Sequence, residues 1–388
     1  MTGTNRVVRV ALPCTGLGRQ RRGFEAFTRE VHAALRDAEG LELRVYGGGG
    51  ALAADERAVW NLPRSSLAGR AASRLTGFGS YFVEQATFFG GFLPSLLTWR
   101  PHLVYFADLN FGNACWHWRR LTGQRFRLLY YNGGPTTRPF TRCDAVQQVT
   151  PGHFRAAMAR GERAERMFAL PHGFALASAL APRDDHKIAQ TRASFGVRPG
   201  QRLVLSVGML GPTLKRMDAL VDAVASMGPD RPHLVLLGQE TPETPALANR
   251  AKALLGDGVR LATWPRERMP DAYAAADAFA LLSLSEGFGL VYVEALAAGL
   301  PCVAHDNPNT QFIFGDHAYL GDTSSPASTA ALLYRALAEA PDSQRRRSRH
   351  AWAHAHFSWD VLAPRYREML LACAAGTRPS WDAPRDAP

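Results

Sequence analysis

Short apolar runs alternate with amphipathic stretches along most of the chain. "RVVRVALP" and "LELRVYG" predict buried strands, and "GFEAFTREVHAALRDA" between them predicts a helix. The apolar residues on one side of that helix are Phe24, Phe27, Val31 and Leu35. The β-rich runs "PHLVYFAD", "FRLLYYNGG" and "DAVQQVT" follow. Strands that alternate with helices predict a parallel sheet with helices on both faces.

A second series of this kind begins at residue 202. Its predicted strands are "RLVLSVG", "HLVLLGQ", "VRLAT", "AFALLSL" and "PCVAHD". Helical stretches such as "RMDALVDAVASM" and "TPALANRAKALLG" separate them. Two such series predict an α/β protein that is built from two doubly wound domains.

The domain boundary is expected in residues 181–201, which are polar and contain proline and glycine. We predict a first domain over residues 1–183, a linker over 184–200 and a second domain over 201–375. The second domain is expected to include a terminal helix in "FSWDVLAPRYREMLLACA". We expect residues 376–388 to form a disordered tail.

The stretch "SLSEGFGLVYVEALAAGLP", residues 283–301, combines a turn with a helix that follows a strand. The helix is expected from Leu290 to Ala298, because Gly299 and Pro301 end it. The turn then lies at the carboxyl end of a strand, where doubly wound sheets bind ligands. The amides of the turn residues would face a phosphate or another oxygen-rich ligand. These turn residues are Gly287, Phe288 and Gly289.

Two carboxylates, Glu286 and Glu294, flank this turn. Glu294 lies in the nearly apolar segment "VYVEALAAG", and a buried carboxylate needs hydrogen-bond partners. The vicinal hydroxyls of a ribose would supply two donors, and Glu286 could accept from a second sugar. Alternatively, Glu294 stabilises the helix by interacting with the helix dipole.

The Glu-Gly-Phe-Gly turn with its second acid resembles the E-x7-E signature of retaining GT-B glycosyltransferases, most closely glycosyltransferase family 4. The resemblance implies two Rossmann-like domains that face a cleft, with a nucleotide-sugar donor held mostly by the second domain. It also implies that Glu286 contacts the donor sugar and Glu294 the ribose. The donor-binding set would include Gly287, Phe288, Gly289 and Leu290.

"LSVGMLGPTLKRMDALVDAV" resembles the first strand, loop and helix of the family's second domain. The resemblance places Gly208 beside the donor and assigns diphosphate binding to Lys215, one of three lysines in the chain. Met209 stands where many relatives have an arginine, which removes one expected contact with the diphosphate. Arg216 could replace that contact or face solvent. Trp264 lies where relatives hold the base, although a tryptophan near a turn also has structural uses.

The first loop, "PCTGLGRQRRGFEAF", fails as a dinucleotide fingerprint because an arginine occupies the third glycine position. In relatives a glycine-rich loop at this place borders the donor phosphates, a role that Gly16 and Gly18 fit. Arg22 is a candidate phosphate or acceptor contact, with a surface arginine as the alternative. Asp108 follows one predicted strand, Asn132 ends the next, and both are candidate contacts with the acceptor. The alternative for Asp108 is that it caps a loop.

The histidines are interpreted as structural. His172 lies in "LPHGF", which resembles the segment that leads into the family's linker. His350, His354 and His356 have helical spacing but lack a companion acid, so we expect an exposed basic helix.

The resemblance implies a retaining transfer in which the departing phosphate helps to deprotonate the acceptor. Glu286, Lys215 and Asp108 are the candidate catalytic residues. No Asp-x-Asp motif occurs, so we expect neither a metal nor another cofactor. The competing functions are a non-catalytic nucleotide-sugar-binding protein, a glycoside hydrolase with two carboxylates, and a phosphorylase. The phosphorylase would need a late pyridoxal lysine, and no lysine follows Lys252.

Composition adds expectations about the compartment and about partners. The five cysteines include no close pairs, which favours a reducing compartment, and no signal segment or spanning apolar stretch is visible. We therefore expect a cytoplasmic protein. Of the net charge of +11, nearly all is in residues 1–185, which carry 24 arginines against 14 acidic residues. This basic half predicts contact with an anionic membrane surface or an acidic acceptor, the alternative being arginines spread over solvated faces. No nucleic-acid partner is expected.

Overall fold

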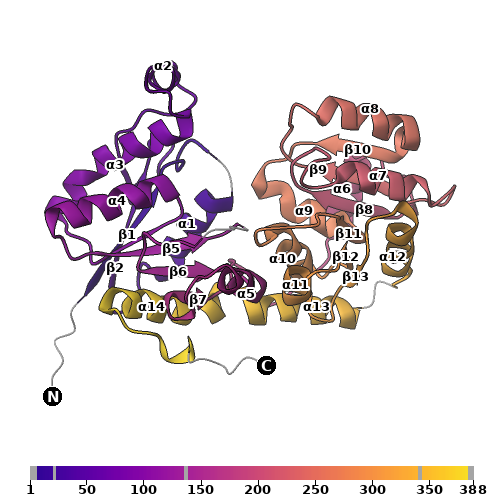
Figure 1. Cartoon of the computed structure of the whole chain (residues 1–388). Helices are drawn as coiled ribbons and strands as arrows, with labels where there is room; N and C mark the ends of the chain where they lie inside the picture. The colour runs from indigo at the N-terminus through magenta and orange to yellow at the C-terminus, as the bar shows by residue number, and fades with distance from the viewer. Residues whose placement is uncertain (1–6, 21–22, 135–138, 340–342, 383–388) are drawn as a thin grey trace. The chain divides into compact units, whose positions relative to one another are not determined.

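The computed structural model describes residues 7–20, 23–134, 139–339 and 343–382. The chain divides into two units (Figure 1). Unit 1 comprises Met1–Ala175 and Ser358–Pro388, and unit 2 comprises Leu176–Phe357. Each unit contains one parallel sheet, which confirms the predicted α/β class with two doubly wound sheets.

The sheet of unit 1 has the strand order β3-β2-β1-β4-β5-β6-β7. Its strands are β1 (Val8–Cys14), β2 (Leu41–Gly47), β3 (Glu56–Ala58), β4 (Leu103–Phe106), β5 (Arg127–Asn132), β6 (Ala145–Gln148) and β7 (Met167–Ala169). The five strands predicted from apolar runs are confirmed, whereas the short edge strands β3 and β7 lack such a run. The strand order reverses direction between β1 and β4, so the loops after these two strands diverge and leave room for a ligand.

Helices cover both faces of this sheet. The helices of unit 1 are α1 (Gly23–Leu35), α2 (Leu67–Thr76), α3 (Ser80–Thr98), α4 (Leu109–Thr122), α5 (Pro151–Ala159) and α14 (Trp359–Ala375). One core joins Phe88 of α3 and Phe111 of α4 to Phe106 and Tyr130 of the sheet. On the other face of the sheet, Phe27 of α1 packs against Tyr105, Tyr131 and Tyr366. Successive strand residues therefore point alternately into the two cores.

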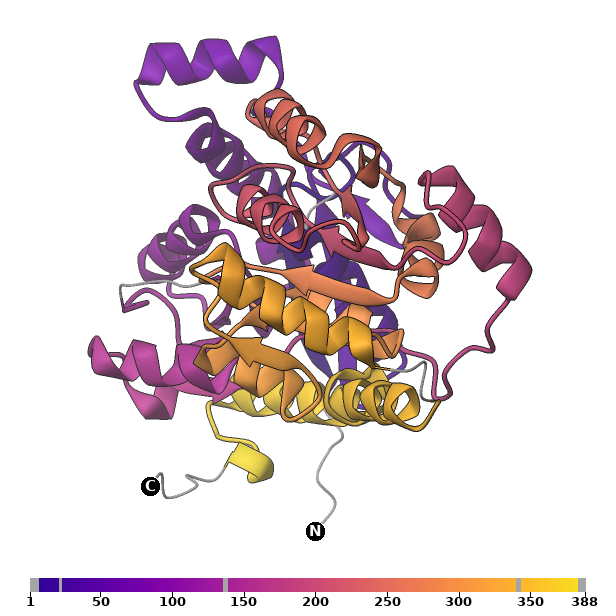
Figure 2. The same ribbon diagram turned by 90° about the vertical axis from the view of Figure 1, so that its right-hand side faces the viewer.

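The sheet of unit 2 has the order β10-β9-β8-β11-β12-β13. Its strands are β8 (Leu203–Val207), β9 (His233–Leu237), β10 (Val259–Ala262), β11 (Ala278–Leu281), β12 (Cys302–His305) and β13 (Tyr319–Gly321). Its helices are α6 (Asp185–Ser194), α7 (Met217–Ala225), α8 (Thr244–Leu255), α9 (Met269–Ala275), α10 (Leu290–Ala297), α11 (Pro308–Phe314), α12 (Pro326–Ala338) and α13 (Ser343–Phe357). Figure 2 shows the strands of this unit among its helices. The order reverses between β8 and β11.

The terminal helix α14 belongs to unit 1, which differs from its expected place in the second domain. Its buried face contains Tyr366, which donates from its hydroxyl to the carbonyl of Pro171 at 2.7 Å. The same hydroxyl accepts from Nε2 of Gln147 on β6 at 2.8 Å. The amphipathic pattern predicted the helix correctly, but a pattern does not say which sheet the apolar face will cover.

The expected linker and tail also differ in part from the structure. Residues 185–194 form α6, whose Ile188 is buried, so this segment is not an extended linker. Residues 380–382 form a short 3₁₀ helix, and residues 383–388 of the predicted tail lie outside the described residues. Among the described residues no helix is both long and apolar enough to cross a bilayer.

Helix α13 exists where the histidines predicted it, but the expectation of an exposed helix is wrong for one side. His350 is 7% exposed, and its Nδ1 lies 2.7 Å from the carbonyl oxygen of Ala297 at the end of α10. Arg349 is 5% exposed and contacts both carboxylate oxygens of Glu339 at 2.6 Å. The sequence favoured exposure because the helix is strongly basic, yet the carbonyl of Ala297 and the carboxylate of Glu339 provide hydrogen-bond partners for these two buried side chains.

Candidate functional site

The loops after β8 and β11 meet where the strand order of unit 2 reverses. Lys215 lies in the first loop and Glu286 in the second. Nζ of Lys215 donates to Oε1 of Glu286 at 2.6 Å, and the two side chains are 19% and 13% exposed. A cation and a carboxylate from different loops are therefore joined at the sheet edge where this fold class binds ligands.

Gly208, directly after β8, gives Lys215 its position. A Cβ atom at residue 208 would lie 3.0 Å from Cγ and 3.1 Å from Cδ of Lys215. These distances are tighter than ordinary packing, so the lysine stem runs across the glycine at close approach. The predicted importance of a glycine here has a physical reason, which is the path of the lysine side chain.

The turn before α10 leaves the positive end of that helix without a side-chain cap. Its N-cap residue Gly289 has φ +87°, and a Cβ there would meet the ring of Tyr292 at 2.4 Å. The first turn of α10 contains no acidic residue. Phe288 is only 4% exposed and packs edge-on against Phe357, so only its backbone is available to contact a ligand. The uncapped amides and the helix dipole favour an anion.

Asn309 on α11 braces this turn, since its Nδ2 donates to the carbonyl of Phe288 at 3.2 Å. Arg216 contacts the beginning of the loop between β11 and α10. The guanidinium of Arg216 donates to the carbonyls of Leu282 at 3.3 Å and Thr323 at 3.1 Å. Arg216 also has φ +49°, a left-handed conformation uncommon for a residue with a side chain. Arg216 is half-buried and its guanidinium contacts the backbone of adjacent loops, while its contact with the diphosphate stays a prediction.

Glu294, in the second turn of α10, is half-buried rather than enclosed by its apolar neighbours. Its Oε2 accepts from the hydroxyl of Tyr273 on α9 at 2.7 Å. Burial raises the pKa of Tyr273 well above its usual value, and the nearby Glu294 carboxylate raises it further, so the phenol remains a donor. The two glutamates of the motif thus have separate protein partners, Lys215 for one and Tyr273 for the other.

Trp264, in the loop after β10, is held by two neighbours within unit 2. Its ring stacks on Phe195 with centroids 4.6 Å apart, and the guanidinium of Arg268 lies 4.0 Å from the ring centroid. Met209, where an arginine was expected from the resemblance, is 40% exposed. Both residues follow strands at the same sheet edge as Lys215.

In unit 1, Asp108 follows β4 at the equivalent reversal of strand order and is 6% exposed. Its Oδ2 accepts from the backbone amide of Thr15 at 3.2 Å and from the Thr15 hydroxyl. Its Oδ1 accepts from the hydroxyl of Tyr81 on α3. Asp108 precedes α4 but makes no side-chain cap to it, so it joins three elements rather than capping a loop.

The predicted glycine loop packs against a second glycine loop in unit 1. Gly18 has φ +85°, and a Cβ there would lie 2.4 Å from the carbonyl oxygen of Gly49. The amide of Ala51 donates to the carbonyl of Gly18 at 3.0 Å. Gly16 is buried at the start of the same loop. This close approach is a sufficient reason for glycine at residue 18, whether or not a phosphate binds beside it. Arg22 lies outside the described residues.

Asn132 ends β5 and is 4% exposed, with its Nδ2 donating to Oε1 of Gln148 on β6 at 2.8 Å. His172 is 2% exposed and its Nδ1 lies 3.2 Å from the hydroxyl of Tyr131. Its ring also packs against Phe27 and Phe174, which matches the structural interpretation. Both side chains are part of the interior of unit 1.

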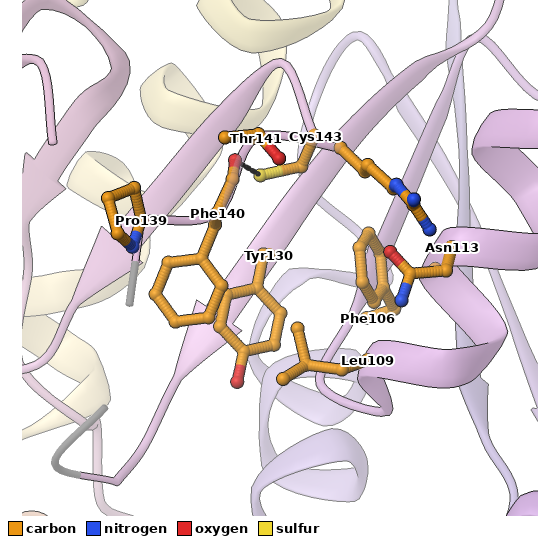
Figure 3. A pocket seen from close by; sticks show the side chains of 10 residues that line it. Phe106, Leu109, Asn113, Tyr130, Pro139, Phe140, Thr141 and Cys143 are labelled. Atoms are coloured by element: carbon orange, nitrogen blue, oxygen red, sulfur yellow. Dashed lines mark hydrogen bonds between the residues drawn. The ribbon is translucent and has the colours of Figure 1, made fainter. Parts of the chain in front are cut away.

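A pocket of about 440 Å³ opens in unit 1 beside the first turn of α4 (Figure 3). Its wall includes three aromatic side chains, Phe106, Tyr130 and Phe140, beside polar residues such as Asn113 and Arg142. Burial and the neighbouring carboxylate of Asp108 are among the causes that raise the pKa of Tyr130 far above its usual value, so its hydroxyl stays protonated. Leu109, the residue after Asp108, lines the pocket, so the pocket lies close to Asp108, and its aromatic side chains suit an apolar group.

Two clusters of predicted residues emerge. Unit 2 joins Gly208, Lys215 and Glu286, with the turn of residues 287–289 beside them. Unit 1 holds Gly16, Gly18 and Asp108 around its own strand reversal. In the part of the chain that the structure describes, no group of three or more His, Cys, Asp or Glu residues could hold a metal ion.

Sequence reasoning missed the partners of these residues, namely Thr15, Tyr81, Tyr273 and Asn309. Thr15 could have been predicted as a partner of Asp108. Thr15 directly follows β1, Asp108 closely follows β4, and these two strands are neighbours in the sheet. Tyr81, Tyr273 and Asn309 come from helices and carry no local signal in the sequence.

Comparison with known proteins agrees with this architecture. A family model described as "Glycosyl transferases group 1" matches residues 187–353. D-inositol 3-phosphate glycosyltransferase from Jonesia denitrificans is 32% identical over 222 residues, which cover 51% of this chain and 50% of that protein. The enzyme of the same name from Rhodococcus erythropolis is 32% identical, over 50% of this chain and 48% of its own length. The chain thus spans about half the length of these relatives.

Solved structures resemble nearly the whole chain at low sequence identity. Sucrose-phosphate synthase from Thermosynechococcus elongatus has a TM-score of 0.77 at 19% identity, over 95% of this chain and all of that one. Anabaena HepE in complex with UDP-glucose has a TM-score of 0.71 at 17% identity, over 94% and 99% of the two chains. The fold is therefore that of the GT-B glycosyltransferases, with two Rossmann-like units.

Proposed function

We propose that the chain transfers a sugar from a nucleoside-diphosphate sugar to a hydroxyl of an acceptor. The observation that carries this proposal is the contact of Lys215 with Glu286 at the strand reversal of unit 2, beside the uncapped start of α10. A cation and free amides suit a diphosphate, and a carboxylate suits sugar hydroxyls. The match to the group 1 glycosyltransferase model covers this same region.

In the proposed reaction, negative charge grows on the diphosphate as the glycosidic bond breaks. The ammonium of Lys215 and the amides at the start of α10 would stabilise that charge, and electrostatic stabilisation of this kind contributes most of the rate enhancement in many enzymes. A diphosphate that takes over the ammonium would leave Glu286 to accept from sugar hydroxyls. Before a donor binds, the ion pair of 2.6 Å holds both side chains at the site.

We further propose that the transfer retains the configuration of the sugar and needs no divalent ion, because a lysine and helix amides can neutralise the leaving group in its place. The departing phosphate would take the proton of the acceptor hydroxyl. Activity that persists in the presence of a chelator supports this part of the proposal, and activity restored only by added Mg²⁺ or Mn²⁺ contradicts it.

For the rest of the donor we propose Glu294 as the ribose contact and Trp264 as a neighbour of the base. A uridine nucleotide is a reasonable first candidate, because similar structures were solved with UDP and with UDP-glucose. For the acceptor, the names of the relatives suggest a phosphorylated inositol. The aromatic pocket beside Asp108 instead favours an acceptor with an apolar group, whose hydroxyl Asp108 would orient.

The test is a thermal-unfolding panel of UDP, GDP and ADP sugars, followed by assays of donor consumption. A ligand at a hundred times its dissociation constant stabilises the folded state by about 2.7 kcal/mol, so binding is readily detected. Stabilisation by one nucleotide sugar with turnover supports the proposed reaction. Stabilisation without turnover across acceptors indicates a binding protein, and no stabilisation by any nucleotide sugar contradicts the proposal.

A further inference from the structure

Unit 1 exposes several large apolar side chains around helix α2 and the start of α3. Leu67 is 80% exposed and Leu75 is 88% exposed, although both belong to the same short helix. Phe78 is 56% exposed, and its ring packs on that of Phe82 at 4.6 Å. We call this surface, formed by residues 67–82, the α2 surface. Such a concentration on one helix is unusual for a face that meets only water.

The helix presents these residues in a stripe. Leu67, Ala71 and Leu75 are spaced four residues apart, so they share one face, and all three are exposed. The buried residue of α2 is Gly69, and the helix is well defined at both ends. Ser66 caps its start and Gly77, with φ +72°, ends it. Figure 1 shows α2 beyond α3, at the end of unit 1 away from its sheet.

The α2 surface is also basic. Residues 57–83 contain four arginines and no acidic residue. Arg64 is paired with Glu84 at 2.6 Å, whereas Arg70 and Arg74 are exposed on α2. At 100° per residue, these two arginines flank the edge of the apolar stripe. The helix therefore combines an apolar face with cations along its border.

We propose that the α2 surface docks on an anionic lipid bilayer. A basic amphipathic helix buries its apolar face at the boundary of headgroups and acyl chains, while its cations meet the lipid phosphates. A second copy of this chain is a weaker match, because residues 57–83 carry no acidic residue and two such surfaces would bring like-charged arginines together, whereas their charge is complementary to anionic headgroups. The charge of the surface thus selects the bilayer as its occupant.

Docking would have a consequence for the site of unit 1. Tyr81, in the first turn of α3, donates to Asp108 at the carboxyl edge of β4. A bilayer that contacts Phe78 and Phe82 would therefore lie near the residue proposed to orient the acceptor hydroxyl. The acceptor would then be a lipid alcohol, an extension that rests on the proposed transferase function, whereas docking itself does not.

The test is co-sedimentation of the full chain with vesicles of phosphatidylcholine alone or mixed with phosphatidylglycerol. We expect binding to the mixed vesicles that weakens as salt rises. In the variant R70Q/R74Q the partition constant should fall about 25-fold, since each cation contributes roughly a five-fold factor. In L67S/L75S binding should be lost as well, because the apolar face is removed. Circular dichroism and thermal unfolding check that both variants remain folded.

The matched control is R155Q/R160Q, which removes two exposed arginines from α5 and its C-cap in the same unit. Vesicle binding by this control should equal that of the unchanged chain. The proposal is overturned if the chain does not sediment with anionic vesicles, or if R70Q/R74Q and R155Q/R160Q bind equally. It is also overturned if the Leu67 and Leu75 changes abolish self-association in sedimentation velocity while vesicle binding persists. These readouts need no donor, so they are independent of the outcome of the nucleotide-sugar panel.

Discussion

A hydrogen atom at the Cα of Gly208 leaves room for the stem of Lys215, whose ammonium then reaches Glu286. This local arrangement connects three residues from two loops. Of the three, only the glycine is constrained by space, and the other two are constrained by their charges. A site that depends on close approach is sensitive to the addition of one methyl group.

We predict that Gly208→Ala lowers kcat by roughly 3- to 10-fold, because the stem of Lys215 must give way by a few tenths of an ångström and a misplacement of about 1 Å costs about 100-fold. The added Cβ would lie 3.0 to 3.2 Å from the stem of Lys215, which must therefore shift. Gly258→Ala is the control, since a Cβ at residue 258 meets no atom within 4 Å. Initial rates of donor consumption for both variants decide the matter, and equal rates would contradict this role of Gly208.

At the residue level the sequence predicted Lys215 and Glu286 through their motifs, and the structure brings them within 2.6 Å of each other. Their catalytic roles remain predictions. The sequence did not predict that Tyr273 would donate a hydrogen bond to Glu294, or that Tyr81 would donate one to Asp108. These pairs lie 21 and 27 residues apart, so their contacts depend on how helices pack and not on local spacing.

Among the elements, α14 shows most clearly what an amphipathic pattern leaves open. Its apolar face was visible in the sequence, but its place on unit 1 follows from contacts with β6 and the segment after β7. Tyr366 is fully buried at the centre of that contact and exchanges hydrogen bonds with Gln147 and Pro171. The strands were easier to predict, because parallel strands buried on both faces appear as continuous apolar runs.

We predict that Tyr366→Phe lowers the free energy of unfolding by about 1–2 kcal/mol, because the carbonyl of Pro171 loses its donor in a buried place. Tyr334→Phe is the control in unit 2. The Tyr334 hydroxyl donates to the carbonyl of Met227, but its side chain is 51% exposed and water can replace that bond. Its change should stay within about 0.5 kcal/mol. Denaturant unfolding measures both, and a Tyr366→Phe value as small as the control would show that α14 is held by packing alone.

For the whole molecule, the predicted division near residues 183–201 and the observed division differ at both ends of unit 2. The segment 185–194 is the helix α6 of unit 2, and the chain returns to unit 1 at Ser358. A return of this kind leaves no sign in composition, because Ser358 is the single residue that separates α13 from α14. The number and type of domains could be predicted from strand and helix alternation, but the membership of the last helix could not.

We predict that a fragment of residues 176–357 folds alone, since it contains the whole sheet of unit 2 and the helices that cover it. A fragment of residues 1–357 should fail to fold unit 1, because it lacks α14 and exposes the face around Phe27 and Tyr105. Amide dispersion in two-dimensional NMR spectra and cooperative thermal unfolding test both. A well-folded unit 1 without α14 would contradict the assignment of that helix.

The central claim is that Lys215 stabilises a leaving diphosphate at the strand reversal of unit 2. The most direct measurement compares kcat of Lys215→Ala with that of Lys252→Ala, using the donor found in the panel. Lys252 is exposed and pairs with Asp257, so its removal takes away one ammonium without touching the site. We predict that kcat falls about 10²- to 10³-fold in Lys215→Ala and is unchanged in Lys252→Ala. Equal turnover by the two variants would contradict the claim.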